Sequence, residues 1–224
     1  MNSFASCYGF PFDRLRSAFA LYATFGALTI LAPALVSQII AAIVGFTVAF
    51  FLAATATASG ISTDAVPLIA KITGALLGWL AYIPTLPFYP AFFRCLDTEA
   101  QGANARIDQL FAWRGLVGPS IATGFLIWAV VLVGFLFCIV PGILMIPLSA
   151  MPYYYVSRGD SGMTAVSKFF SALASQPMVI LYSWGMFVPL VLLGYMCCCI
   201  GILVTLPMFF AAIYFMMRGL AVPR

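Results

Sequence analysis

Three long stretches of the chain contain no charged residue, and they constrain its fold more than any other feature. They cover residues 17–63, 115–157 and 169–217. A helix needs about 20 apolar residues to cross a bilayer. The second and third stretches, of 43 and 49 residues, therefore predict two spans each. We place their turns near residues 138–142 and 197–201.

The composition requires that most of the surface contacts lipid. Only 7% of the residues are charged and 64% are hydrophobic, with a mean hydropathy of +1.11, whereas a soluble domain carries roughly 25% charged residues. Helices and closed barrels are the structures that satisfy every backbone polar group in hydrocarbon. Continuous apolar runs do not fit the alternating segments of about 10 residues in a membrane barrel. We predict an all-α, polytopic integral membrane protein with one transmembrane domain over residues 1–224.

The first uncharged stretch allows two interpretations. It holds either one long span after an interfacial helix, or two spans that turn near Pro33 to Gln38. A further span, over residues 67–93, is expected after Asp64.

The chain repeats itself at an offset of 60 residues. Six identities occur without a gap, and repeats at a fixed period indicate duplicated structural units. The paired residues are Gly134 and Gly194, Cys138 and Cys198, Pro147 and Pro207, Tyr154 and Tyr214, Arg158 and Arg218, and Gly159 and Gly219.

Each repeat also begins alike, with a short amphipathic stretch, a proline and a span. The stretches are residues 106–119 and 163–177, and residues 12–33 fit the same template less closely. We therefore predict six transmembrane helices arranged as three repeated hairpins, each preceded by a short interfacial amphipathic helix. The three pseudo-repeats cover residues 12–94, 106–159 and 163–219.

The placement of positive charge supports six spans. Six spans put Lys71 alone on one face, whereas seven spans give a seven-to-three division. Cytoplasmic loops are enriched in Lys and Arg, so both termini are expected in the cytoplasm. The opposite face then carries Arg14, Arg16, Arg94, Arg106, Arg114, Arg158, Lys168, Arg218 and Arg224.

Small residues recur at every fourth position in the first span, around Gly45, and the next span contains the GxxxG motif of Gly74 and Gly78. This spacing lets helix backbones approach closely. It fits either a homodimer interface or packing within the first hairpin.

Pro147 and Pro207 each lie 11 residues before an arginine at the inner face, about 16 Å along a helix and so close to the bilayer midplane. Broken helices at that depth can form the substrate site of a transporter, or the prolines can simply kink the helices. Ion pathways usually need charges within the spans, and here the carboxylates fall in loops or at span ends. Residues 94–115 are expected to be a solvated connector.

Cys198 lies where Cys138 lies in the preceding repeat, at an expected outer turn. Two interpretations stay open. The cysteines form part of a small apolar turn, because free Cys behaves as a buried hydrophobic residue. Alternatively, a disulfide joins Cys138 to one of residues 197–199 in an oxidising compartment.

No catalytic residue, cofactor site or metal site is predicted. The chain has no histidine, which removes the commonest general base and metal ligand. It also lacks the serine-hydrolase, phosphate-loop and zinc-protease motifs. The amphipathic stretches place Arg and Lys beside Phe and Trp, which favours anionic lipid headgroups.

Residues 106–219 resemble a group of bacterial membrane proteins, on the basis of Pro141, Gly142, Ile143, Pro147 and Tyr154 in one helix and Ala165, Ser167 and Pro177 at a helix entry. The group includes the YciC-like proteins and the membrane domain attached to some glycerophosphodiester phosphodiesterases. This resemblance implies a six-helix membrane domain in the bacterial inner membrane. It carries over no catalytic residue, because the hydrolase domain is absent here.

The leading functional hypothesis is a non-enzymatic membrane protein that binds lipids or a partner, either a second copy or another membrane protein; no nucleic acid is expected. The alternative is a small transporter or channel with proline-kinked helices around a central pathway. The alternative predicts a polar cavity that reaches the midplane.

Overall fold

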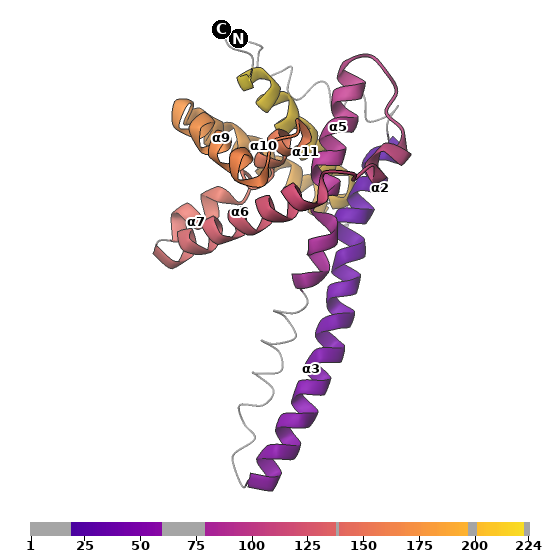
Figure 1. Cartoon of the computed structure of the whole chain (residues 1–224), viewed down its shortest axis with the longest axis vertical. Coiled ribbons are helices and arrows are strands. Elements are labelled where there is room, and N and C mark those ends of the chain that lie inside the picture. Colours follow the sequence, from indigo (N-terminus) through magenta and orange to yellow (C-terminus); the bar gives the residue numbers. More distant parts are fainter. Residues whose placement is uncertain (1–18, 60–78, 138, 197–200, 222–224) are drawn as a thin grey trace. The chain divides into compact units, whose positions relative to one another are not determined.

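The computed structural model describes residues 19–59, 79–137, 139–196 and 201–221, and every regular element within them is a helix (Figure 1). This agrees with the all-α prediction. Helices satisfy backbone hydrogen bonds within one segment, which suits a chain so poor in charge. The chain forms two compact units, one of residues 28–85 and one made of the remainder.

The unit of residues 28–85 is built on one long helix. A π-helical turn, η1 (Ala27–Leu31), leads into α3 (Ala32–Ser59), and the 3-10 helix η2 (Trp79–Thr85) packs against α3. Pro33 follows this π-helical turn directly within the continuous helix, where it cannot donate a hydrogen bond to the preceding turn. A turn near Pro33 to Gln38 is therefore wrong, because these residues are helical.

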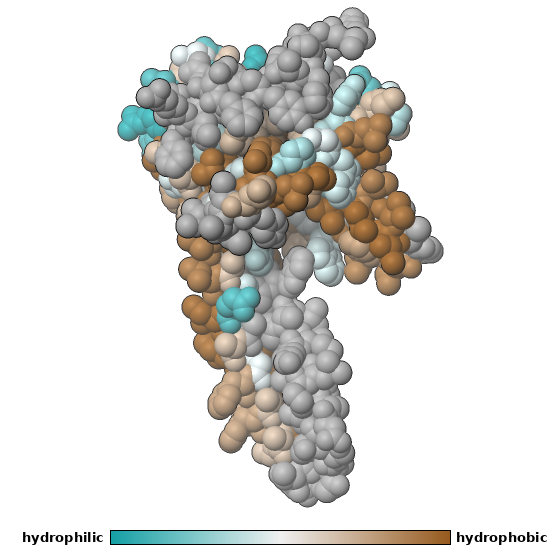
Figure 2. All heavy atoms as spheres, turned by 180° about the vertical axis from the view of Figure 1, so that it is seen from behind, coloured by the Kyte–Doolittle hydropathy of each residue, from teal (hydrophilic) through white to brown (hydrophobic). Residues whose placement is uncertain are grey.

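The surface of α3 is strongly apolar. Phe46 is 75% exposed and Phe50 and Phe51 are also exposed, and Figure 2 shows hydrophobic colouring along the helix. Thr47 donates its hydroxyl to the Ile43 carbonyl at 2.8 Å, so its polar group is satisfied within the helix. Gly45 lies on α3, whereas Gly74 and Gly78 lie outside the described residues.

Two described helices are long and apolar enough to cross a membrane, namely Ala20–Thr55 and Val117–Leu136. A third span results if the bent pair Gly162–Ser175 and Met178–Gly194 is counted as one, and its two halves meet at 102°. The shorter helix Leu203–Gly219 is also apolar. Two to three candidate spans are thus present in the described part of the chain, and the six-span count remains a prediction.

In the second unit, α6 (Val117–Phe137) packs against α7 (Ile139–Met145). The two helices run in opposite directions (Figure 1), but residues 139–142, where the turn was expected, are the first residues of α7. A Cβ atom at Gly142 would lie 2.6 Å from the Phe135 ring, so glycine permits the close contact of these helices.

The chain after α7 is broken rather than helical. Residues 146–151 form successive turns around Pro147 before α8 (Pro152–Ser157) begins. In these turns several N–H groups donate to the carbonyl three residues back, as in Leu148 N to the Met145 carbonyl at 3.1 Å. Trp184 Nε1 donates to the Leu144 carbonyl at 3.4 Å. A proline that interrupts the helix accounts for this break.

Pro207 behaves differently from Pro147, although the two are paired in the sequence repeat. It lies inside α11 (Ile202–Ala221), which remains helical and packs against α10 (Met178–Met196). A proline removes the hydrogen bond to the carbonyl four residues earlier, here that of Leu203. That carbonyl faces Gly26 of α2 (Phe19–Gly26), where a Cβ would lie 2.1 Å from the oxygen.

Of the expected interfacial helices, the one over residues 163–177 is present as an α-helix, whereas the start of the stretch 12–33 lies outside the described residues. α9 (Gly162–Ser175) is amphipathic, with Gly162, Ala165, Val166 and Phe169 buried on one face and Ser161 as its N-cap. In contrast, residues 106–119 contain only the five-residue 3-10 helix η3 (Ile107–Phe111) before α6. The short helix expected there is therefore a 3-10 helix, and Gly115, with a positive φ of 80°, lies between it and α6.

The core of this unit is aromatic. Phe25 of α2 stacks on Phe92 of α5 (Phe88–Ala100), with ring centroids 4.1 Å apart, and meets Phe210 of α11 edge-on. Phe93 and Tyr214 stack at 6.2 Å. Helices from distant parts of the sequence therefore share one packed interior.

Candidate polar pocket

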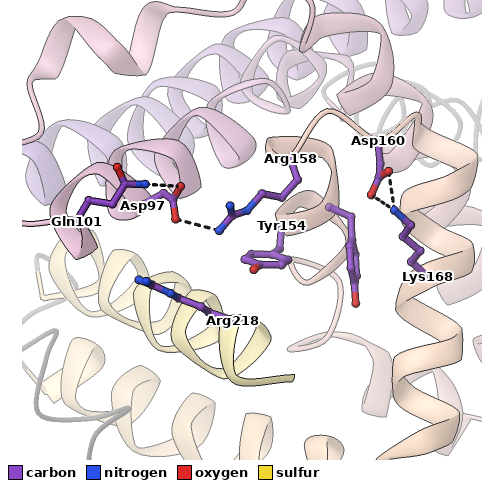
Figure 3. Close-up of a pocket in the computed structure, with 8 residues that line it drawn as sticks. Asp97, Gln101, Tyr154, Arg158, Asp160, Lys168 and Arg218 are labelled. Atoms are coloured by element: carbon purple, nitrogen blue, oxygen red, sulfur yellow. Dashed lines mark hydrogen bonds and ion pairs between the residues drawn. The ribbon is translucent and has the colours of Figure 1, made fainter. Parts of the chain in front are cut away.

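Asp97, near the C-terminal end of α5, connects three segments that are far apart in the sequence. Its Oδ1 accepts hydrogen bonds from Arg158 Nη2 at 2.9 Å and from the Tyr214 hydroxyl at 2.5 Å. Its Oδ2 accepts from Gln101 Nε2 at 3.2 Å. One carboxylate thus links α5 to the end of α8 and to α11 (Figure 3).

The local sequence explains how these groups converge. Gln101 lies four residues after Asp97, one helical turn away, where side chains meet. Tyr154 precedes Arg158, and Tyr214 precedes Arg218, by the same spacing. The Tyr154 and Tyr214 rings lie 5.8 Å apart. The repeat therefore brings two equivalent Tyr–Arg pairs to the same place.

A second ion pair lies beside the first. Lys168 of α9 approaches both carboxylate oxygens of Asp160 at 2.7 Å. Its Nζ also lies 6.0 Å from the centre of the Tyr155 ring. On the other side, the guanidinium carbon of Arg158 lies 5.4 Å from the Tyr154 ring centre. Each cation is held by a carboxylate and an aromatic face.

These residues line an open pocket of about 480 Å³. It contains three cations and two carboxylates, which leaves one positive charge in excess. Figure 3 shows Arg218 on α11, with its guanidinium turned toward the side where Asp97 and Gln101 lie. The lining residues are Asp97, Gln101, Tyr154, Tyr155, Arg158, Asp160, Lys168 and Arg218.

Arg218 provides the excess charge. Three ion pairs join described residues, and they use Arg106, Arg158 and Lys168. Arg218 makes no ion pair with any carboxylate in the described ranges. Arg158 is held by Asp97 instead. Burial lowers the pKa of Arg158, but the neighbouring Tyr154 and Asp97 outweigh this and raise it.

Arg94 lies on α5 three residues before Asp97 and is not one of the residues that line the pocket. Its Nε donates to the Ser157 carbonyl at 3.0 Å, which satisfies a carbonyl at the end of α8. Arg94 and Asp97 therefore both hold α5 against α8.

The sequence singled out part of this site. The repeat-motif residues Tyr154, Arg158 and Arg218 line the pocket, and Tyr214 bonds to Asp97 behind them. Pro147 and Pro207 do not line it. Cys138 and Cys198 lie outside the described residues, so the disulfide stays a prediction.

Residues 94–115 were expected to be a solvated connector, and this prediction is wrong for the first residues of the segment. Residues 94–100 are the last part of α5, and Glu99 is only 5% exposed. Asp97, Gln101, Asp160 and Lys168 were not predicted as site residues. The two Tyr–Arg motifs could have indicated these residues from the sequence, because guanidinium groups that lie close together need a nearby carboxylate.

Within the described residues, no group of three or more His, Cys, Asp or Glu side chains could hold a metal ion. Cys95 is buried, and burial together with Glu99 and Asp108 raises the pKa of its thiol to about 12. A thiol of such high pKa is a poor nucleophile.

Comparison with known proteins gives relatives whose names state no activity. The chain is 28% identical over 198 residues to the uncharacterised protein Rv2560 of Mycobacterium tuberculosis and 27% identical to the uncharacterised protein Mb2590 of Mycobacterium bovis. The matches include 82% of this chain and 60% of each relative, so the chain spans less than two thirds of their length. No protein-family model and no solved structure matches it. The resemblance to YciC-like proteins remains a prediction.

Proposed function

We propose that this chain is a non-enzymatic, multi-pass integral membrane protein of the bacterial inner membrane that binds anionic lipid at its cytoplasmic face. The observation that carries the proposal is the polar pocket, in which Arg218 pairs with no carboxylate of the described residues, in a chain with large apolar surfaces. Charged groups are scarce in this sequence, and several of them gather at this one place.

The apolar surfaces support a lipid environment. On α6 and α7, Phe125, Trp128, Leu136, Ile139 and Val140 are all exposed, and Figure 2 shows hydrophobic surface on the face it presents. Soluble monomers rarely expose contiguous apolar patches larger than a few hundred Å². A bilayer would cover such side chains.

The distribution of the pocket residues supports the proposed side of the membrane. The charged pocket residues all belong to segments that the six-span arrangement puts on the cytoplasmic side, and Tyr154 and Tyr155 belong to the cytoplasmic end of an expected span. There, anionic lipids attract basic side chains with about 1 kcal/mol for each Lys or Arg near the surface.

The experiment is native mass spectrometry of the purified protein in detergent, with phosphatidylglycerol and phosphatidylcholine of identical acyl chains. We expect phosphatidylglycerol to remain bound at several-fold higher occupancy. Equal occupancy of the two lipids would overturn the lipid-binding function, whatever its site. Co-purification of one stoichiometric membrane protein in its place would favour partner binding.

A transporter or channel is the second candidate function. It is favoured by the break at Pro147, where Trp184 holds the Leu144 carbonyl, because broken helices line the substrate sites of transporters. The aromatic core of Phe25, Phe92 and Phe210 argues the other way, since these side chains fill the space between their helices. Flux of ions or small solutes into proteoliposomes, absent from protein-free vesicles, would establish transport.

A further inference from the structure

We infer that the pocket around Arg218 is a subsite for one phosphate group that carries a single negative charge, as in the phosphodiester headgroup of an anionic phospholipid. This inference rests on the proposed function and makes it specific. It assigns a ligand class to a place on the chain, and it depends on three features of the pocket.

The first feature is the charge balance. Asp97 neutralises Arg158 and Asp160 neutralises Lys168, at 2.9 and 2.7 Å. Arg218 remains, with a guanidinium group that matches phosphate oxygens in geometry. One added negative charge therefore makes the pocket neutral. A phosphate monoester carries about −1.5 to −2 at pH 7, and its second charge would face Asp97 and Asp160.

The second feature is that the part of α11 that carries Arg218 is held in position. Tyr214 lies one turn before it on α11, is fully buried, and donates to Asp97. This bond fixes α11 against α5 at the level of the pocket. The backbone that carries the cation is therefore already in place, so an anion that binds here orders only the Arg218 side chain.

The third feature disfavours zwitterionic headgroups. A quaternary ammonium group is usually bound on the faces of aromatic rings. Here the Tyr154 and Tyr155 rings already lie near Arg158 and Lys168. These ring faces are therefore already occupied by cations. The headgroup of phosphatidylcholine has no net charge, so it does not neutralise the excess positive charge of the pocket.

The experiment compares variants of the full chain by native mass spectrometry with phosphatidylglycerol, phosphatidylcholine and phosphatidic acid. Arg218→Gln is expected to lower the preference for phosphatidylglycerol about tenfold, because a charged hydrogen bond in a partly exposed site is lost. Arg218→Lys should retain part of it. The matched control is Arg106→Gln, an exposed arginine paired with Asp108 outside the pocket, which should keep the wild-type preference.

A second variant has the opposite expected effect, and a gain of binding cannot be explained by misfolding as a loss in Arg218→Gln could be. Asp160→Asn releases Lys168 and raises the net charge of the pocket by one, so it should strengthen phosphatidylglycerol binding about threefold to tenfold, within the range of a partly exposed charge interaction. Unchanged or weaker binding by this variant contradicts the subsite.

The outcomes separate this inference from the function on which it rests. A wild-type lipid preference that survives in Arg218→Gln overturns the subsite and leaves the function intact. Tighter binding of phosphatidic acid than of phosphatidylglycerol overturns the single-charge assignment. If inorganic phosphate alone displaced phosphatidylglycerol below millimolar concentration, the site would bind a soluble anion. This result would contradict a lipid as the source of the phosphate group.

Discussion

At the scale of single residues, Asp97 joins more segments of the second unit than any other pocket residue described above. Its carboxylate accepts from Arg158, Tyr214 and Gln101, and its side chain is 25% exposed. A carboxylate that satisfies three donors cannot be removed without leaving polar groups short of partners. Asp97 therefore serves both the stability of the fold and the charge balance of the pocket.

We predict that Asp97→Asn destabilises the protein by about 1–3 kcal/mol, because Arg158 loses its counter-charge and Tyr214 its strong acceptor. Thermal unfolding in detergent, followed by intrinsic fluorescence, measures the change. Asp108→Asn is the matched control, since Asp108 is 68% exposed and pairs only with Arg106. Equal melting temperatures for the two variants would contradict the role of Asp97.

Cys95 gives a second prediction at this scale. With a pKa of about 12, about one thiol in 10,000 is ionised at pH 8, and the side chain is fully buried. Alkylation of Cys95 by a maleimide should be far slower in the folded protein than in SDS. Because the pKa is raised, the rate should keep rising with pH well above 9. Mass spectrometry of the peptide that contains Cys95 measures this, and equal labelling in both states would show that the thiol is accessible.

At the scale of helices, the contact between α2 and α11 shows how a proline is accommodated. Pro207 leaves the Leu203 carbonyl without its helical donor, and that oxygen lies against Gly26. Small residues allow backbones to approach closely in membrane helices. The pair of Pro207 and Gly26 therefore lets α11 stay helical, whereas the chain at Pro147 breaks.

We predict that Gly26→Ala destabilises the protein by about 1–3 kcal/mol, because its Cβ would overlap the Leu203 carbonyl and force the helices apart. Gly185→Ala in α10 is the control, since nothing lies within 4 Å of a Cβ at that position and alanine is the better helix former by about 1 kcal/mol. Chemical denaturation in mild detergent compares the two. If the Gly26 variant were as stable as wild type, α2 and α11 could move apart without loss of stability, which would contradict the prediction.

At the scale of the whole molecule, the open question is how many times the chain crosses the bilayer. Two described helices meet the criterion for spans, or three with the bent pair. The charge distribution favours six. Pro147 interrupts one of the apolar segments after α7, and residues 60–78, which include most of one expected span, lie outside the described residues.

The six-span arrangement predicts that Gln101, Asp160 and the C-terminus all face the cytoplasm. Fusions of alkaline phosphatase after Gln101, Asp160 and Arg224 should be inactive, and fusions of green fluorescent protein at the same positions should fluoresce. A fusion after Cys198 should give the reverse pattern. Phosphatase activity after Asp160 would contradict the arrangement and the proposed side of the pocket.

The amino-acid sequence by itself determined the helical class, the apolar segments and the positions of the Tyr–Arg motifs. These follow from composition and short-range spacing, which act within one segment. Tertiary structure decided that Asp97 is the common partner of Arg158 and Tyr214, 61 and 117 residues away. It also decided that Pro147 breaks its segment while Pro207 does not. Both outcomes depend on which groups from distant segments lie within hydrogen-bonding or van der Waals distance, and local sequence patterns contain no such information.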